Sequence, residues 1–143
     1  MKDHCVPLYL ARRLKIAGFK NPCLFGYDKC DMFFKDLHSE REFLGVNYNA
    51  SGYSCSAPFW QQVTDWFRLE HKLEVGAVCN FNDNTFEYPS YNAYVGHYIL
   101  SGPYHNYATY GSYEVAMITA IDKGLDKILG IVEKVEYKHT RTI

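Results

Sequence analysis

The groups in this chain that could carry chemistry are histidines, cysteines and carboxylates. His97 and His105 lie in a tyrosine-rich stretch, where a histidine beside a cysteine or a carboxylate could act as a metal ligand or a general base. A single histidine on a strand is more often a packed or hydrogen-bonded residue. Asp65, Glu70 and His71 could form an acid–base group, but a solvated helix face explains them better. The sequence therefore predicts no catalytic residue, and an enzyme of unknown class is the third hypothesis for its function.

The cysteines are odd in number and scattered along the chain: Cys5, Cys23, Cys30, Cys55 and Cys79. Neither the Cys23/Cys30 spacing nor the His4-Cys5 pair has the close pairing of structural zinc sites. The first residues also lack the apolar core of a secretory signal. We therefore expect a reduced, cytoplasmic chain that binds no metal and no cofactor.

Length and composition limit the classes of protein further. At 143 residues, 48% hydrophobic and 22% charged, the chain fits one globular domain with its own core. The net charge of −1 gives no electrostatic footprint for a nucleic acid. No apolar run approaches the roughly 20 residues that cross a bilayer, so the sequence predicts no membrane span.

The tyrosine-rich segment, residues 88–113, contains eight of the 13 tyrosines and no Asp, Glu, Lys or Arg. Such a composition suits half-buried strands and aromatic contact surfaces. One interpretation is an ordinary strand with an aromatic outer face, followed by a loop that packs over the last helix. The other is an uncharged patch that docks a partner, because Tyr is enriched in interface cores while Lys and Glu are depleted. The candidate partner surface is Tyr91, Tyr94, Tyr98, Tyr104 and Tyr107.

The elements that position these residues follow from periodicity and turn chemistry. Residues 58–71 have apolar side chains at helical spacing, and residues 73–81 alternate as a strand does. Asn82-Asp83-Asn84 predicts a turn, followed by a return strand at 85–88 and a third strand at 91–100. The last helix is expected at 112–131, capped by Ser112. The order from 57 to 131 is thus α-β-β-β-α, and the fold class is α+β, with an antiparallel sheet of three or more strands packed by two main helices.

The N-terminal part is expected to complete this unit. A helix is predicted at 6–17, short strands lie between 22 and 48, and residues 47–56 form a loop. Residues 132–143 are a C-terminal tail. The whole chain, 1–143, is predicted to be a single domain.

The last helix has two apolar sides. An aliphatic stripe is expected to pack on the sheet; its members are Val115, Ile118, Ile121, Leu125, Ile128 and Leu129. Ala116, Ala120 and Gly124 recur at four-residue spacing on another side. A mid-helix glycine costs about 1 kcal/mol relative to alanine, so this small-residue face either meets a closely approaching neighbour or is ordinary helix composition.

The helix–sheet–helix order is that of a double-stranded RNA-binding domain, which makes nucleic acid the second hypothesis. Such domains grip phosphates with lysines at the start of their last helix. Here Tyr113 and Glu114 occupy the corresponding stretch, and residues 88–113 supply no cation to accompany base stacking. Charge therefore argues against nucleic-acid binding.

Three segments resemble a group of small uncharacterised proteins from Bacteroides-type gut bacteria and their phages or mobile elements. They are residues 14–23 (Leu-Lys-Ile-Ala-Gly-Phe-Lys-Asn-Pro-Cys), 57–68 (Ala-Pro-Phe-Trp-Gln-Gln-Val-Thr-Asp-Trp-Phe-Arg) and 110–116 (Tyr-Gly-Ser-Tyr-Glu-Val-Ala). Phe67 stands where that group commonly has Leu. The resemblance implies no activity and no functional residues. Together with the uncharged tyrosines, it predicts a non-enzymatic, phage-related cytoplasmic protein that binds a protein partner or itself.

Overall fold

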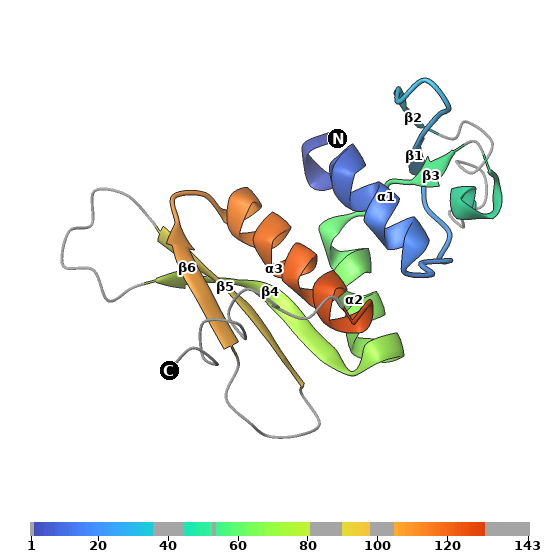
Figure 1. Ribbon diagram of the computed structural model, residues 1–143. Coiled ribbons are helices and arrows are strands. Elements are labelled where there is room, and N and C mark those ends of the chain that lie inside the picture. The colour runs from blue at the N-terminus through green and yellow to red at the C-terminus, as the bar shows by residue number, and fades with distance from the viewer. Residues whose placement is uncertain (1, 36–44, 53, 81–89, 98–104, 131–143) are drawn as a thin grey trace, which may run out of the picture.

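The computed structural model describes residues 2–35, 45–52, 54–80, 90–97 and 105–130, and within them the fold class is α+β, as predicted (Figure 1). Two three-stranded antiparallel sheets are present among these residues, in the orders β2-β1-β3 and β4-β5-β6. The helices are η1 (Lys2–His4), α1 (Leu8–Ile16), η3 (Tyr48–Ala50), α2 (Trp60–His71) and α3 (Tyr113–Ile128). The strands are β1 (Phe25–Tyr27), β2 (Phe33–Lys35), β3 (Cys55–Ser56), β4 (Leu73–Asn80), β5 (Ser90–His97) and β6 (His105–Tyr110).

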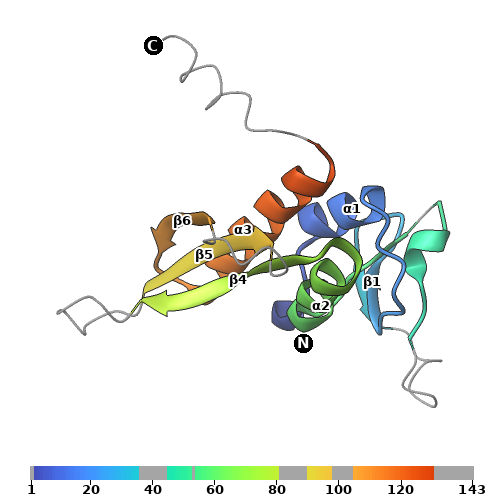
Figure 2. The same cartoon turned by 90° about the horizontal axis from the view of Figure 1, so that it is seen from below.

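The larger sheet and its two helices reproduce the expected α-β-β-β-α order. β4 and β5 pair along their whole length, from Leu73↔His97 to Asn80↔Ser90, without a break in register. α3 covers one side of this sheet, and α2 packs against α3 at the margin formed by β4 (Figures 1 and 2). At Gly124 of α3, an added Cβ would lie 3.0 Å from both Phe67 of α2 and Val75 of β4. The two helices and the inner side of β4 therefore meet at one point.

The identity of the third strand differs from the expectation. The predicted return strand at 85–88 lies outside the described residues, and the strand that pairs with β4 is β5. The third strand is β6, in a stretch that the sequence presented as a loop. β6 pairs with β5 with a register shift between Asn92 and Tyr94. This irregular pairing and the mixed polar and aromatic composition of β6 hide the strand alternation on which sequence reasoning depends.

The last helix begins where it was predicted to begin, but the set of its residues that is buried differs from the prediction. The Ser112 hydroxyl accepts a hydrogen bond from the backbone N–H of Val115 at 3.1 Å. Ile121 and Leu125 are fully buried, but Val115, placed in the core stripe, is 46% exposed. The residues buried on α3 include the small-residue face: Ala116, Met117, Ala120, Ile121, Gly124 and Leu125. The small-residue face is also buried, because α3 packs against the sheet on one side and against α2 on another.

The N-terminal part forms a small sheet beside α1. The helix expected at 6–17 is α1, and its Leu10, Ala11 and Leu14, which share one helical side, are fully buried. β1 is the central strand, paired with β2 on one side and β3 on the other. The expectation of a loop at 47–56 is wrong at its end, where the last two residues form β3 and pair with β1. Of the short strands expected between 22 and 48, the part at 36–44 lies outside the described residues, and Val46, which is described, forms a single bridge with Cys23.

One ion-pair cluster ties α1 to α3. Arg13 donates to the carboxylates of Asp122 and Asp126, the latter at 2.7 Å, and also to the Asp122 carbonyl at 3.1 Å. Tyr9 donates to Asp122 at 2.8 Å. Buried apolar residues from both parts of the chain form one continuous core. Among the described residues, no helix combines the length and the apolar character needed to span a membrane.

Candidate functional site

The tyrosines of the candidate partner surface do not share one face. Tyr91 lies on the side of β5 that faces the helices, with Ala93 and Val95, both 0% exposed. Its ring contacts that of Tyr113 on α3 edge-on, with 5.8 Å between centroids. By strand alternation, Tyr94 lies on the opposite side. Tyr91 therefore belongs to the helix-covered side of the sheet.

Tyr94 covers a glycine on the neighbouring strand. It pairs with Gly76 of β4, and a Cβ added to Gly76 would lie 2.6 Å from the Tyr94 hydroxyl oxygen and 2.8 Å from its ring carbon Cζ. No side chain fits there without moving the ring. This aromatic cover over a strand glycine is a known device for stabilising a sheet, so Tyr94 has a structural role besides any role in binding.

For the other three tyrosines of the candidate surface, the structure gives no side-chain position. Tyr98 and Tyr104 lie outside the described residues, and Tyr107 lies in β6, where the structure describes the backbone alone. The small-residue face, Ala116, Ala120 and Gly124, is buried within the chain against the sheet and α2. The close approach that its composition predicts is confirmed, but it is internal packing.

The side of the β4-β5-β6 sheet opposite α3 is the better candidate surface. We name it the open face and define it by Glu74, Gly76, Val78, Asn92 and Tyr94, which alternate with the buried positions of β4 and β5. Val78 is 53% exposed. Glu74 is the one charged residue of this set, and Arg68 of α2 binds it through Nε–Oε1 at 2.5 Å and Nη2–Oε2 at 3.2 Å. The open face therefore carries no net charge and is partly apolar.

Gly76 and Val78 were not singled out by sequence reasoning. The signal was present in part, since even-numbered positions of the strand at 73–81 must share a side. The pairing of Gly76 with Tyr94 depends on the length of the connection between β4 and β5, which the sequence did not fix. Because Tyr91 and Tyr94 are three residues apart on one strand, the same alternation places them on opposite sides of β5.

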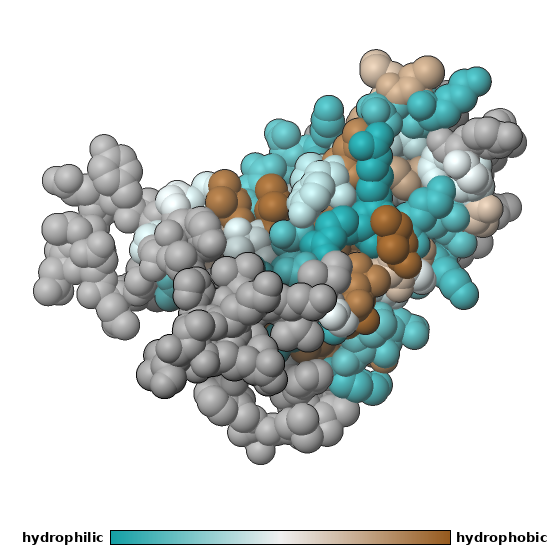
Figure 3. Space-filling view, in the orientation of Figure 1, coloured by the Kyte–Doolittle hydropathy of each residue, from teal (hydrophilic) through white to brown (hydrophobic). Residues whose placement is uncertain are grey.

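Among the described residues, the surface over α1 and α3 exposes apolar side chains in separate places. In Figure 3 the surface over α1 and α3 is mainly hydrophilic, and the brown side chains there are divided by teal ones. Tyr113 and Val115, at 47% and 46% exposure, belong to the start of α3. Isolated exposed apolar residues of this kind are normal on a protein surface.

For His97 and His105 the structure describes the backbone alone, and the described side chains around Asp65 and His71 form no catalytic arrangement. His97 ends β5, where it pairs with Leu73, and His105 begins β6, where it pairs with Val95. Asp65 accepts hydrogen bonds from Gln61 at 2.9 Å and Arg68 at 3.3 Å. His71 instead packs edge-on against Trp66, with 4.7 Å between ring centroids, and burial lowers the pKa of its imidazole.

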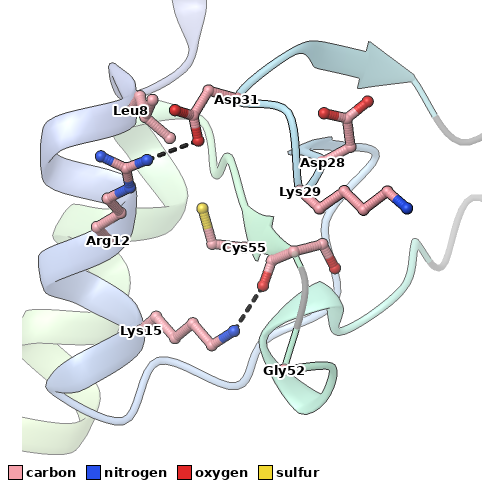
Figure 4. A pocket seen from close by; sticks show the side chains of 9 residues that line it. Leu8, Arg12, Lys15, Asp28, Lys29, Asp31, Gly52 and Cys55 are labelled. Carbon is pink, nitrogen blue, oxygen red and sulfur yellow. Dashed lines mark hydrogen bonds and ion pairs between the residues drawn. The ribbon is translucent and has the colours of Figure 1, made fainter.

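A polar pocket of about 170 Å³ lies between α1, the β1–β2 turn and the segment before β3 (Figure 4). Its cations are Arg12, Lys15 and Lys29. Arg12 binds Asp31 at 2.6 Å, and Lys15 donates to the carbonyls of Ser51 and Ser54 at 2.6 and 2.7 Å. Only Lys29 has no hydrogen bond or ion pair within the described part of the chain. An incoming anion would have to displace existing partners, so the pocket is not a preformed anion site.

Comparison with protein-family models, with curated proteins and with solved structures finds no significant match for this chain. Any functional proposal therefore depends on the chain's own geometry.

The buried thiols are poor nucleophiles. Burial raises the pKa of Cys55, which lines the polar pocket, and raises those of Cys5 and Cys23 to about 11 and about 12. A protonated thiol neither attacks a substrate nor binds a metal well. Among the described residues, no group of three or more His, Cys, Asp or Glu side chains has the arrangement of a metal site.

Proposed function

We propose that this protein is a non-enzymatic binding protein that associates with a protein partner, or with itself, through the open face of the β4-β5-β6 sheet. The observation that carries the proposal is the placement of α3, with α2 packed against it, on one side of this sheet. The other side presents Tyr94 and Val78 around a backbone glycine. The sequence resemblance adds the expectation of a cytoplasmic protein from a phage or mobile element.

The physical chemistry of the open face suits protein contact. Its one carboxylate, Glu74, is already neutralised by Arg68, so covering this face would not strand an unpaired charge. Tyr94 is held in place over Gly76. A fixed aromatic ring loses little conformational entropy on binding, which is one reason tyrosine is enriched at interface centres.

Replacing Tyr94 with alanine tests the proposal. We expect a loss of stability of about 1 kcal/mol, because Gly76 is uncovered, and at least about tenfold weaker association. Light scattering over a range of concentrations measures self-association, thermal unfolding measures stability, and affinity capture from the source cells measures partner binding.

Tyr113→Ala is the matched control. Tyr113 is 47% exposed and lies on the helix side of the sheet, so its loss should leave association unchanged. Two results would contradict the proposal: a folded Tyr94→Ala variant that associates as the wild type does, or a wild-type protein that neither self-associates nor retains a partner.

The element order favours duplex RNA binding as a second candidate, and charge opposes it. The exposed side chains at the start of α3 are Ser112, Tyr113, Glu114 and Val115, where a phosphate grip needs cations. We expect no change in the fluorescence anisotropy of a labelled RNA duplex even at about 50 mM salt. Tight binding that weakens steeply with added salt would revive this candidate.

A further inference from the structure

We infer that two copies of this protein pair edge to edge through β4, antiparallel, and so join their β4-β5-β6 sheets into one six-stranded sheet. The inference builds on the proposed function and names its partner: a second copy of this chain. The paired sheets would present one open face of twice the width.

The first argument is that β4 is an edge strand of its sheet. It pairs with β5 over all eight residues in regular register, and no strand pairs with its other side among the described residues. Natural edge strands are usually blunted by charge, proline, bulges or shortness. β4 has no proline and no bulge in its pairing with β5. Its one charged residue, Glu74, lies near the start of the strand, where Arg68 of α2 reaches it past the edge, so the later residues 76–80 are the part of the edge offered for pairing.

The other edge of the sheet is less suited to pairing. β6 is six residues long, and its pairing with β5 shifts register between Asn92 and Tyr94. Such an irregularity twists a strand and disturbs the row of backbone groups that a partner would need. Of the two edges, β4 therefore offers the longer and more regular row of hydrogen-bonding groups.

The second argument is that β4 is complementary to itself. A two-fold axis normal to the sheet makes each residue oppose one on the same side of the partner strand, so that even positions meet even positions. An axis through Ala77 places Gly76 opposite Val78 of the second copy. It also places Glu74 opposite Asn80, so that the two Glu74 carboxylates do not meet.

This register gives Val78 a partner. The Tyr94 ring lies over Gly76, and Val78 from the second copy would arrive beside that ring. Aromatic and β-branched side chains in such a cross-strand arrangement attract each other. Because of the symmetry the contact forms twice, and it would cover Val78, which is 53% exposed in the single chain.

Val78→Lys tests the inference against Val115→Lys. Both valines are about equally exposed, at 53% and 46%, but Val115 lies on α3, the helix that covers the other side of the sheet. Lysine is a common protecting residue of natural edge strands. We expect a wild-type dimer by light scattering, a dissociation constant raised at least about tenfold by Val78→Lys through two lost contacts, and no change from Val115→Lys. Unfolding midpoints should show that both variants are folded.

Amide hydrogen exchange of the wild type gives a reading that needs no variant. Those amides of residues 76–80 in β4 that point away from β5 should exchange more slowly as the protein concentration rises through the dissociation constant. A wild-type protein that stays monomeric at every concentration overturns the inference, while partner capture through Tyr94 could still succeed. A dimer that survives Val78→Lys, or whose β4 amides gain no protection, also overturns it and places the self-interface elsewhere. Protection of β4 by a different protein only would identify the edge as a docking strand for that protein and overturn self-pairing.

Discussion

Replacing Arg13 with alanine should lower the free energy of unfolding by about 3 kcal/mol. The Arg13 side chain is 16% exposed and binds Asp122 and Asp126, whose side chains are 30% and 24% exposed. Removing the guanidinium would leave two half-buried carboxylates one helical turn apart without a counter-charge. Their repulsion and poor hydration act only in the folded state, so the effect should appear as a loss of stability in denaturant titration.

Arg12→Ala is the matched control for this prediction. Arg12 lies next to Arg13 on α1, and its ion pair with Asp31 joins side chains that are 57% and 54% exposed. A solvent-exposed pair of this kind contributes less than about 1 kcal/mol. Replacing Asp122 and Asp126 with asparagine in the Arg13→Ala background should recover part of the loss, because the uncompensated charges disappear. Equal and small losses of stability for Arg12→Ala and Arg13→Ala would contradict a stabilising role of the ion-pair cluster between α1 and α3.

The helices could be predicted from the sequence because their signals are local. Leu10 and Leu14 mark one side of α1, and both are buried. Ser112 caps α3 as its position suggests. α2 occupies Trp60–His71, close to the expected 58–71. In each case the decisive residues lie within a turn or two of one another, so the backbone needs no distant partner to select the conformation.

The sheet and the candidate surface could be predicted only in part because their signals are not local. The alternation in β4 was visible, but its pairing with β5 and the position of Tyr94 over Gly76 require the register between two strands. β6 was missed because its residues read equally well as loop. The side on which α3 packs was misjudged at Val115, since only the assembled fold shows that a sheet contacts the small residues.

Replacing Gly124 with leucine should destabilise the protein by about 3 kcal/mol. Gly124 is buried in the middle of α3, and even a Cβ there would lie 3.0 Å from the Phe67 ring carbon Cζ and from Val75 Cγ2. Both neighbours are themselves fully packed, at 0% and 2% exposure, so α3 would have to lift from the sheet. A lower unfolding midpoint and faster exchange of the β4 and β5 amides would measure the effect.

Lys127→Leu places the same side chain on an exposed position of α3 and separates packing from helix propensity, since leucine favours helix at both sites. We expect a change below about 1 kcal/mol there. If Gly124→Leu were as well tolerated as Lys127→Leu, the close approach of α2, α3 and β4 would be wrong. The open face would then lose its basis as well, because the same contact at Gly124 places α3 on one side of the sheet and leaves Tyr94 and Val78 on the other.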